Sequence, residues 1–242
     1  MSYLLLSLAS IIAGLISGVT GTGSSLILIP VLTATLGAKA AVPVMAIAAL
    51  LGNISRVYLW RKNINWSAFR WFGLPALPAV IAGANSLIVL PEAGLNIILG
   101  SFFLVLCPVR HLLKHYQFRL RKSHLLFCGM LTGFLTGLVF STGPLMLPLL
   151  SAYGLSPAPL LATESAISFL LYLTKSVTFT QLGILSPDIL LCGFFTGIMI
   201  TLGTFGGKHI VAALPAVLYS LILDSVLIVA GGSLIIRAVI TY

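Results

Sequence analysis

Charged residues are scarce in this sequence: only 7% of its 242 residues are Asp, Glu, Lys or Arg, and only 4 are acidic. A soluble domain carries roughly a quarter of its residues as charges, so a mostly water-facing surface is excluded. Alternation of apolar and polar residues with a period of two is also missing, which excludes a transmembrane β-barrel. The long apolar runs, with a mean hydropathy of +1.16, predict an all-α integral membrane protein surrounded by lipid bilayer.

Cysteine is rare as well. Cys107, Cys128 and Cys192 are an odd number and lie in apolar stretches. Their spacing fits neither a disulfide framework nor a metal knuckle, so we assign them to packing and expect no metal and no cofactor. No Lys or Arg precedes Lys39, so the apolar N-terminal stretch is expected to belong to the mature fold rather than to a cleaved signal.

The net charge of +9 comes from basic residues spread over loops. Nucleic-acid binding is excluded, because no basic patch interleaved with aromatic residues is present. Positive charges that flank apolar spans are typical of cytoplasmic loops. We therefore expect a multi-pass protein of the inner, cytoplasmic membrane, and we keep a homodimer open.

Most of the apolar runs are long enough for a membrane-spanning helix of about 20 residues. The predicted spans are Ala40–Tyr58, Phe69–Leu90, Ala93–Val109, Leu160–Phe179, Ile189–Gly207 and Ala216–Ile236. Two further apolar segments, Leu4–Leu36 and Leu125–Tyr153, are interrupted by residues that are poor helix formers, at 18–25 and at 141–144. Each arm of these broken segments is expected to cross about half of the bilayer.

The two broken segments resemble each other, and the likeness continues along the chain at offsets of 119 to 120 residues. The matched pairs include Gly14 with Gly133, Gly18 with Gly137, Thr22 with Thr142, Arg56 with Lys175, Gly73 with Gly193 and Gly83 with Gly203. We predict two repeats, 1–118 and 119–242, that together form one transport domain. Basic loops fall on opposite sides of the two halves, which predicts inverted repeats, each a broken, re-entrant helical hairpin plus three transmembrane helices.

Helix breaks inside a membrane create sites for anions, because the first N–H groups of each new helix have no partner within that helix. We expect the tips of the two hairpins to meet and to form a polar cradle for a small anion. The predicted substrate-binding residues at the tips are Thr20, Gly21, Thr22, Gly23, Ser24, Ser25, Ser141, Thr142 and Gly143. Small residues also allow tight helix packing, and we favour that interpretation for Gly14, Gly18, Gly133 and Gly137.

Ionisable residues inside apolar spans are the second indication of a site. Arg56 and Lys175 occupy matching positions, and we include both as candidate substrate-binding residues; the alternative is that they extend to the lipid headgroups. Glu164 and Asp224 are candidates for coupling transport to a proton or a cation. Asp224 is equally compatible with simple pairing to a neighbouring helix.

The halves open with GLISGVTGTGSSLILIPVL and GMLTGFLTGLVFSTGPLMLPLL, followed by Gly37 and Gly154. This pattern resembles the sulfite exporter TauE/SafE family of membrane transporters over essentially the whole chain. In that family the first break usually reads GxGGG, and here Ser24 and Ser25 replace two of the glycines. The resemblance implies transport of sulfite or small organosulfur anions such as sulfonates, in bacteria or archaea.

We therefore expect a secondary transporter that moves a small anion by alternating access. A passive anion channel is an alternative that the sequence does not separate from a carrier. An intramembrane enzyme is a weaker alternative with no catalytic residues assigned, because all 4 histidines lie in or beside loops and no nucleophile motif is evident. A membrane scaffold has no positive support.

Overall fold

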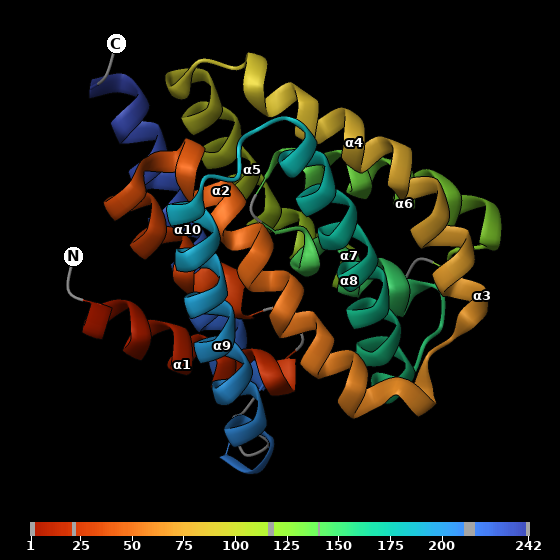
Figure 1. Cartoon of the computed structure of the whole chain (residues 1–242). Coiled ribbons are helices and arrows are strands. Elements are labelled where there is room, and N and C mark those ends of the chain that lie inside the picture. Colours follow the sequence, from red (N-terminus) through yellow and green to blue (C-terminus); the bar gives the residue numbers. More distant parts are fainter. Residues whose placement is uncertain (1–2, 21–22, 116–118, 140, 211–215, 241–242) are drawn as a thin grey trace.

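The computed structural model describes residues 3–20, 23–115, 119–139, 141–210 and 216–240. Every regular element in these ranges is a helix, as the predicted all-α class requires. The elements (Figure 1) are α1 (Tyr3–Thr20), α2 (Gly23–Trp60), the 3-10 helix η1 (Arg61–Asn63), α3 (Trp66–Ala68), the π-helix η2 (Phe69–Gly73), α4 (Leu74–Val89), α5 (Glu92–His115), α6 (Lys122–Leu138), α7 (Gly143–Ala152), α8 (Pro157–Gln181), α9 (Pro187–Ile210) and α10 (Ala216–Ile240).

The outer surface of the bundle is apolar. Val89, Phe127, Leu191 and Val239 each expose between 69% and 85% of their surface, and such exposure is favourable only against lipid. Helices or helical runs long and apolar enough to cross a membrane are Val31–Asn63, Trp66–Val89, Glu92–Val109, Pro157–Gln181 and Pro187–Gly206. The chain is therefore a multi-pass helical membrane protein. The remaining predicted span, Ala216–Ile236, falls within α10.

Both predicted helix breaks are confirmed. Helix α1 ends at Thr20 and α2 begins at Gly23, whereas α6 ends at Leu138 and α7 begins at Gly143. The first arms are longer than expected: α1 has 18 residues and α6 has 17, or about 26 Å at a rise of 1.5 Å per residue. The half-bilayer length fits only α7, with 10 residues or about 15 Å.

Each second arm ends at a glycine with a positive φ angle. Gly37 divides α2 into two segments with φ 74° and ψ 165°, and Gly154 follows α7 with φ 99°. Side chains with a Cβ rarely adopt such angles, so glycine allows the chain to turn there into the next long helix. The second segment of α2 and helix α8 are the long helices that follow.

Glycines on α1 and α6 lie directly against the backbone of other helices. A Cβ on Gly14 of α1 would lie 2.2 Å from the carbonyl oxygen of Ile200 in α9, and one on Gly133 of α6 would lie 2.4 Å from that of Ala76 in α4. Gly137 is equally close to Val80, at 2.3 Å. The packing interpretation is thus confirmed for these glycines, and each first arm packs against a helix of the other half (Figure 1).

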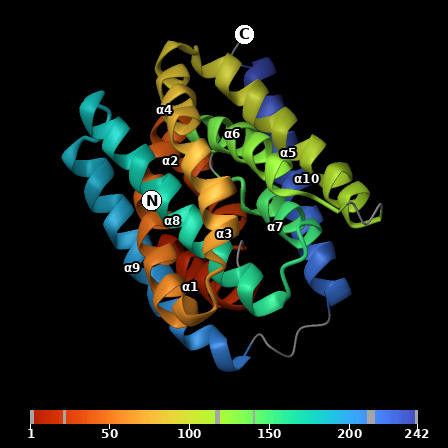
Figure 2. The same ribbon diagram turned by 90° about the vertical axis from the view of Figure 1, so that its right-hand side faces the viewer.

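The last helices of the two halves, α5 and α10, lie side by side (Figure 2). Gly100 of α5 approaches Gly231 of α10, where a Cβ would meet the Gly231 carbonyl at 2.8 Å. Further along α5, the side chain of His111 meets that of Asp224, which lies earlier in α10. Residue numbers rise along one helix as they fall along the other, so α5 and α10 run in opposite directions.

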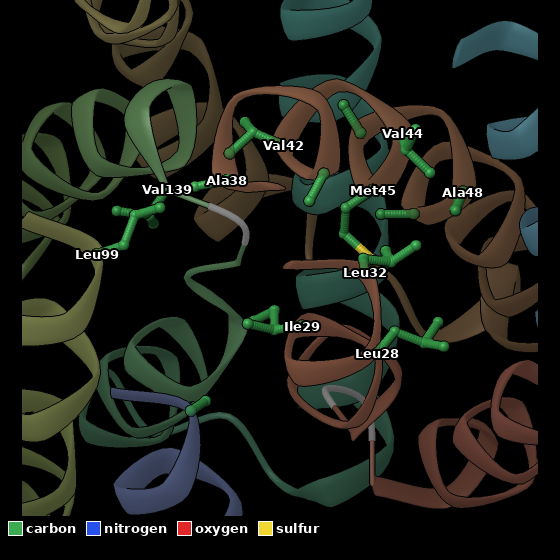
Figure 3. Close-up of a cluster of buried hydrophobic side chains, with 14 of the residues drawn as sticks. Leu28, Ile29, Leu32, Ala38, Val42, Val44, Met45, Ala48, Leu99 and Val139 are labelled. Carbon is green, nitrogen blue, oxygen red and sulfur yellow. The ribbon is translucent and has the colours of Figure 1, made fainter. Parts of the chain in front are cut away.

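The largest buried cluster lies around the two segments of α2. Leu28, Ile29 and Leu32 come from the segment before Gly37, and Met45 comes from the one after it. All four are fully buried, and Figure 3 shows Met45 pointing toward Leu32. These apolar contacts hold the start of α2 at a fixed place beneath its second segment, and this positions the first break.

Candidate functional site

A small polar cavity lies where the two breaks converge. It is lined by side chains from α1, α2 and α8 and by the start of α7, namely Ser17, Ser24, Ser25, Ala49, Gly52, Asn53, Arg56, Ser141, Gly143, Glu164, Ser168 and Tyr172. Its free volume is about 20 Å³, which is room for about one water molecule. We call it the central cavity.

Two helix starts contribute to the central cavity. Ser24 and Ser25 lie in the first turn of α2, and Gly143 is the first residue of α7. Helix starts carry a partial positive charge of about half a unit and N–H groups without partners in the helix. The serine hydroxyls add further donors, and Gly143 lets the backbone come close. The converging tips therefore present several hydrogen-bond donors to the cavity.

Arg56 and Glu164 form an ion pair at the cavity wall. Nη1 of Arg56 lies 3.0 Å from Oε2 of Glu164, and the residues expose only 7% and 1% of their surface. Asn53, one turn before Arg56, accepts a hydrogen bond from the other guanidinium nitrogen. Ser168 donates a hydrogen bond of 2.7 Å to Oε1 of Glu164. The guanidinium and the carboxylate are thus oriented by neighbours as well as by each other.

Tyr172 connects the two breaks. Its phenol lies close to the side chains of Ser25, at the start of α2, and Ser141, just before α7, in the lining of the cavity. Glu164, Ser168 and Tyr172 are spaced four residues apart on α8, so they share one helix face. This face of α8 forms the cavity wall opposite Arg56.

Lys175 points away from the central cavity and binds backbone. Its Nζ donates to the carbonyl oxygens of Thr136, at 2.7 Å, and Val139, at 2.8 Å. It also lies over the ring of Phe179, 5.4 Å from the centroid. Thr136 and Val139 are at the end of α6, where carbonyls have no partner within the helix. Lys175 therefore stabilises the chain at the second break, and Thr142 joins it there through a 2.5 Å contact with the Thr136 hydroxyl.

The interpretation that Arg56 and Lys175 extend to the headgroups is wrong. Arg56 is 7% exposed and Lys175 is fully buried, because each finds oxygen partners inside the protein. Asp224 lies elsewhere, with its carboxylate 3.4 Å from Nε2 of His111. The central cavity thus brings together Ser24, Ser25, Arg56, Ser141, Gly143 and Glu164, but not Thr142, Lys175 or Asp224.

Some predicted tip residues have no described surroundings. Gly21 and Thr22 lie outside the described residues, as do the side chain of Thr20 and the surroundings of Gly23. Other cavity residues were missed by the sequence interpretation: Ser17, Asn53, Ser168 and Tyr172. A signal for two of them was present, because Asn53 lies three residues from Arg56 and Ser168 lies four residues from Glu164, so each shares a helix face with that charged residue.

The chemistry of the central cavity is suited to an anion rather than to a cation. Its acidic lining residue, Glu164, faces a guanidinium, and a divalent metal requires carboxylates that are not already paired with a cation. The other polar lining groups are hydroxyls and one amide, which can donate hydrogen bonds to oxyanion oxygens.

Residues 6–234 match the family described as Sulfite exporter TauE/SafE. No curated protein and no solved structure gives a significant match. The architecture defines a multi-pass helical membrane protein with a small polar cavity at its two helix breaks. Because the family match covers nearly the whole chain, this protein belongs to the sulfite exporter TauE/SafE family. Its class is accordingly an anion exporter-type membrane transporter.

Proposed function

We propose that this protein is a secondary carrier that moves sulfite or a small organosulfonate across the cytoplasmic membrane, with the central cavity as its binding site. The observation that carries the proposal is the buried guanidinium of Arg56 facing a cavity at which both helix starts converge. A guanidinium presents a planar fork of donors that matches the oxygens of sulfite or of a sulfonate group.

Alternating access between inverted halves is part of the proposal. The last helices of the halves, α5 and α10, run antiparallel, as an inverted pair must. The first arm of each half packs against a helix of the other half, α1 against α9 and α6 against α4. The two halves therefore interlock around the cavity. Inverted repeats with binding sites at broken helices are a common plan for secondary transporters.

The size of the cavity favours a carrier over a channel. A free volume of about 20 Å³ is too small for an oxyanion, so binding requires the two breaks to move apart. Tyr172 lies beside both Ser25 and Ser141, so these are the contacts that such a movement must open. A conducting pore would instead need a continuous wet path.

Glu164 is the proposed coupling group. An incoming anion competes with the Glu164 carboxylate for Arg56, and two anions beside one guanidinium leave a net negative charge in the membrane interior, which is costly. Protonation of Glu164 removes that charge and releases Arg56. One proton then accompanies each monovalent anion. Asp224 pairs with a neighbouring helix through His111, so we leave the coupling role to Glu164.

Flux into proteoliposomes tests the binding site. The full-length protein is assayed with sulfite, a sulfonate, sulfate, a carboxylate and a halide. A double variant, Arg56→Gln with Glu164→Gln, removes both charges together and avoids leaving either one unpaired in the interior. We expect saturable sulfite or sulfonate flux in the parent and at least a tenfold loss in the double variant, equivalent to about 1.4 kcal/mol of anion binding.

The matched control is Lys62→Gln, which removes an exposed cation in η1 and should leave flux unchanged. Undiminished flux in the double variant would refute a site at Arg56. Flux that rises linearly with concentration and ignores a counter-gradient would replace the carrier with a channel.

A further inference from the structure

Helices α5 and α10 bring a thiol, an imidazole and a carboxylate together, away from the central cavity. The residues are Cys107 and His111 of α5 and Asp224 of α10. One ligand atom from each lies within 4.8 Å of the other two. The sequence interpretation assigned Cys107 to packing because the spacing of the three cysteines fits neither a disulfide framework nor a metal knuckle. Tertiary structure supplies the missing partner from a residue more than a hundred positions away.

The fold explains why these side chains meet. Cys107 and His111 are four residues apart on α5, so they lie on one face, one turn above the other. The close approach of Gly100 to Gly231 lets α5 and α10 pack with their backbones nearly in contact. Asp224 of α10 is therefore held against the His111 side of α5.

The hydrogen bonding of His111 prepares one ring nitrogen as a ligand. Its Nδ1 lies 2.9 Å from the backbone carbonyl oxygen of Cys107, which accepts a hydrogen bond only if Nδ1 carries the proton. In the neutral ring, Nε2 then has a lone pair and faces the carboxylate of Asp224. An Nδ1–H donated to a carbonyl is the usual arrangement that orients a metal-bound histidine.

The spacing of the two oriented ligand atoms matches a shared ion. Nε2 of His111 lies 3.4 Å from Oδ2 of Asp224. Zinc binds nitrogen and carboxylate oxygen at about 2.0–2.2 Å in a tetrahedron, which places two such ligands about 3.3–3.6 Å apart. A sulfur ligand in the same tetrahedron lies about 3.6 Å from the nitrogen, so a small side-chain rotation of Cys107 completes the set.

We propose that Cys107, His111 and Asp224 form a binding site for zinc or a zinc-like transition metal between α5 and α10. Thiolate, imidazole and carboxylate together suit such metals, whereas calcium and magnesium prefer oxygen ligands alone. Metal binding releases the thiol proton of Cys107 to water, and the resulting thiolate and the Asp224 carboxylate together neutralise a divalent ion, so the loaded site is neutral. His111 is exposed, with 58% of its side chain accessible, and provides the route of entry.

Bound metal would clamp the last helices of the two halves to each other. With three protein ligands, the fourth tetrahedral position stays open to water. Because His111 is exposed, we expect an exchangeable site that responds to metal concentration. Metal binding at α5 and α10 does not depend on the function proposed for the central cavity.

Cobalt(II) is the probe that tests the site, because a thiolate bound to cobalt gives a charge-transfer band in the near ultraviolet. The full-length protein in detergent is stripped with a chelator and titrated with cobalt, and then zinc is added to displace it. We expect one cobalt per chain with a thiolate band. Cys107→Ser should abolish the band, and His111→Ala and Asp224→Asn should each weaken binding by at least about tenfold.

The chain offers matched controls. Cys128→Ser and Cys192→Ser remove the other thiols, and His124→Ala removes a histidine outside the cluster; all three should bind cobalt like the parent. Zinc should also raise the melting temperature of the parent and of these controls, because it binds the folded state. It should not raise that of Cys107→Ser, which keeps nearly the same side-chain size and is the decisive variant.

A thiolate band that persists in Cys107→Ser, or disappears in Cys128→Ser or Cys192→Ser, would place the metal elsewhere and overturn the proposal. Absence of both the band and the zinc-dependent thermal shift in the parent would reduce the cluster to an ion pair between His111 and Asp224.

Discussion

Arg56 and Lys175 occupy matching positions in the sequences of the two halves, 119 residues apart, yet their side chains bind different partners. Arg56 faces the central cavity and pairs with Glu164, whereas Lys175 donates to the carbonyls of Thr136 and Val139 at the second break. The planar guanidinium fits a carboxylate or an oxyanion, and the compact ammonium fits several carbonyl oxygens at a helix end. Of these two cations, Arg56 therefore lines the central cavity, and Lys175 stabilises the chain at the second break.

The largest expected effect of a single substitution is the loss of stability on removing the Lys175 ammonium group. Lys175→Met leaves the Thr136 and Val139 carbonyls without their buried donor, and each loss costs about 1–3 kcal/mol. We expect the free energy of unfolding to fall by about 2–6 kcal/mol, measured by unfolding in a denaturing detergent. Lys62→Met, at an exposed position, should change it by less than about 0.5 kcal/mol. Unchanged stability in Lys175→Met would mean that its hydrogen bonds are not structural.

The shared scaffold is tested by matching glycines. Gly14→Ala and Gly133→Ala each place a Cβ within 2.4 Å of a carbonyl oxygen of the opposing helix. Both should therefore lower the free energy of unfolding by about 1–3 kcal/mol, to a similar extent in the two halves. Gly232→Ala is the control, since a Cβ there meets nothing within 4 Å and alanine favours the helix. A large effect in only one half would argue against equivalent packing.

The smallest expected effect comes from Glu164, whose carboxylate pairs with Arg56. The charged and titratable neighbours of Glu164 among the described cavity residues are Arg56 and Tyr172. If protonated Glu164 is the form that admits the anion, sulfonate flux rises as pH falls, by at most tenfold per pH unit for one proton, or about 1.4 kcal/mol. Glu164→Gln should make flux independent of pH. A sulfonate is used because it stays ionised throughout, and a pH profile like that of the parent would remove Glu164 from coupling.

Sequence reasoning reached the class of the molecule and part of its site. Breaks at 18–25 and at 141–144 were predicted because glycine, proline and hydroxyl residues interrupt helices locally, and the helix ends at Thr20 and Leu138 confirm an interruption in each segment. The meeting of Ser24 and Ser25 with Ser141 and Gly143 was also expected. The roles of Lys175, Asn53, Ser168 and Tyr172 were not, because they depend on which helix face meets which neighbour. The inverted order of the halves and the identity of the anion stay predictions.

Composition alone determined that the protein lies in lipid, since so few charges leave no other solvent for its surface. Local residue chemistry determined where its helices break. Only the tertiary structure decided that Arg56 meets Glu164, 108 residues away, that Lys175 turns to backbone, and that Cys107, His111 and Asp224 converge. Rotation of a helix about its axis by part of a turn changes each of these partners, and that rotation is set by packing against other helices rather than by the helix's own sequence.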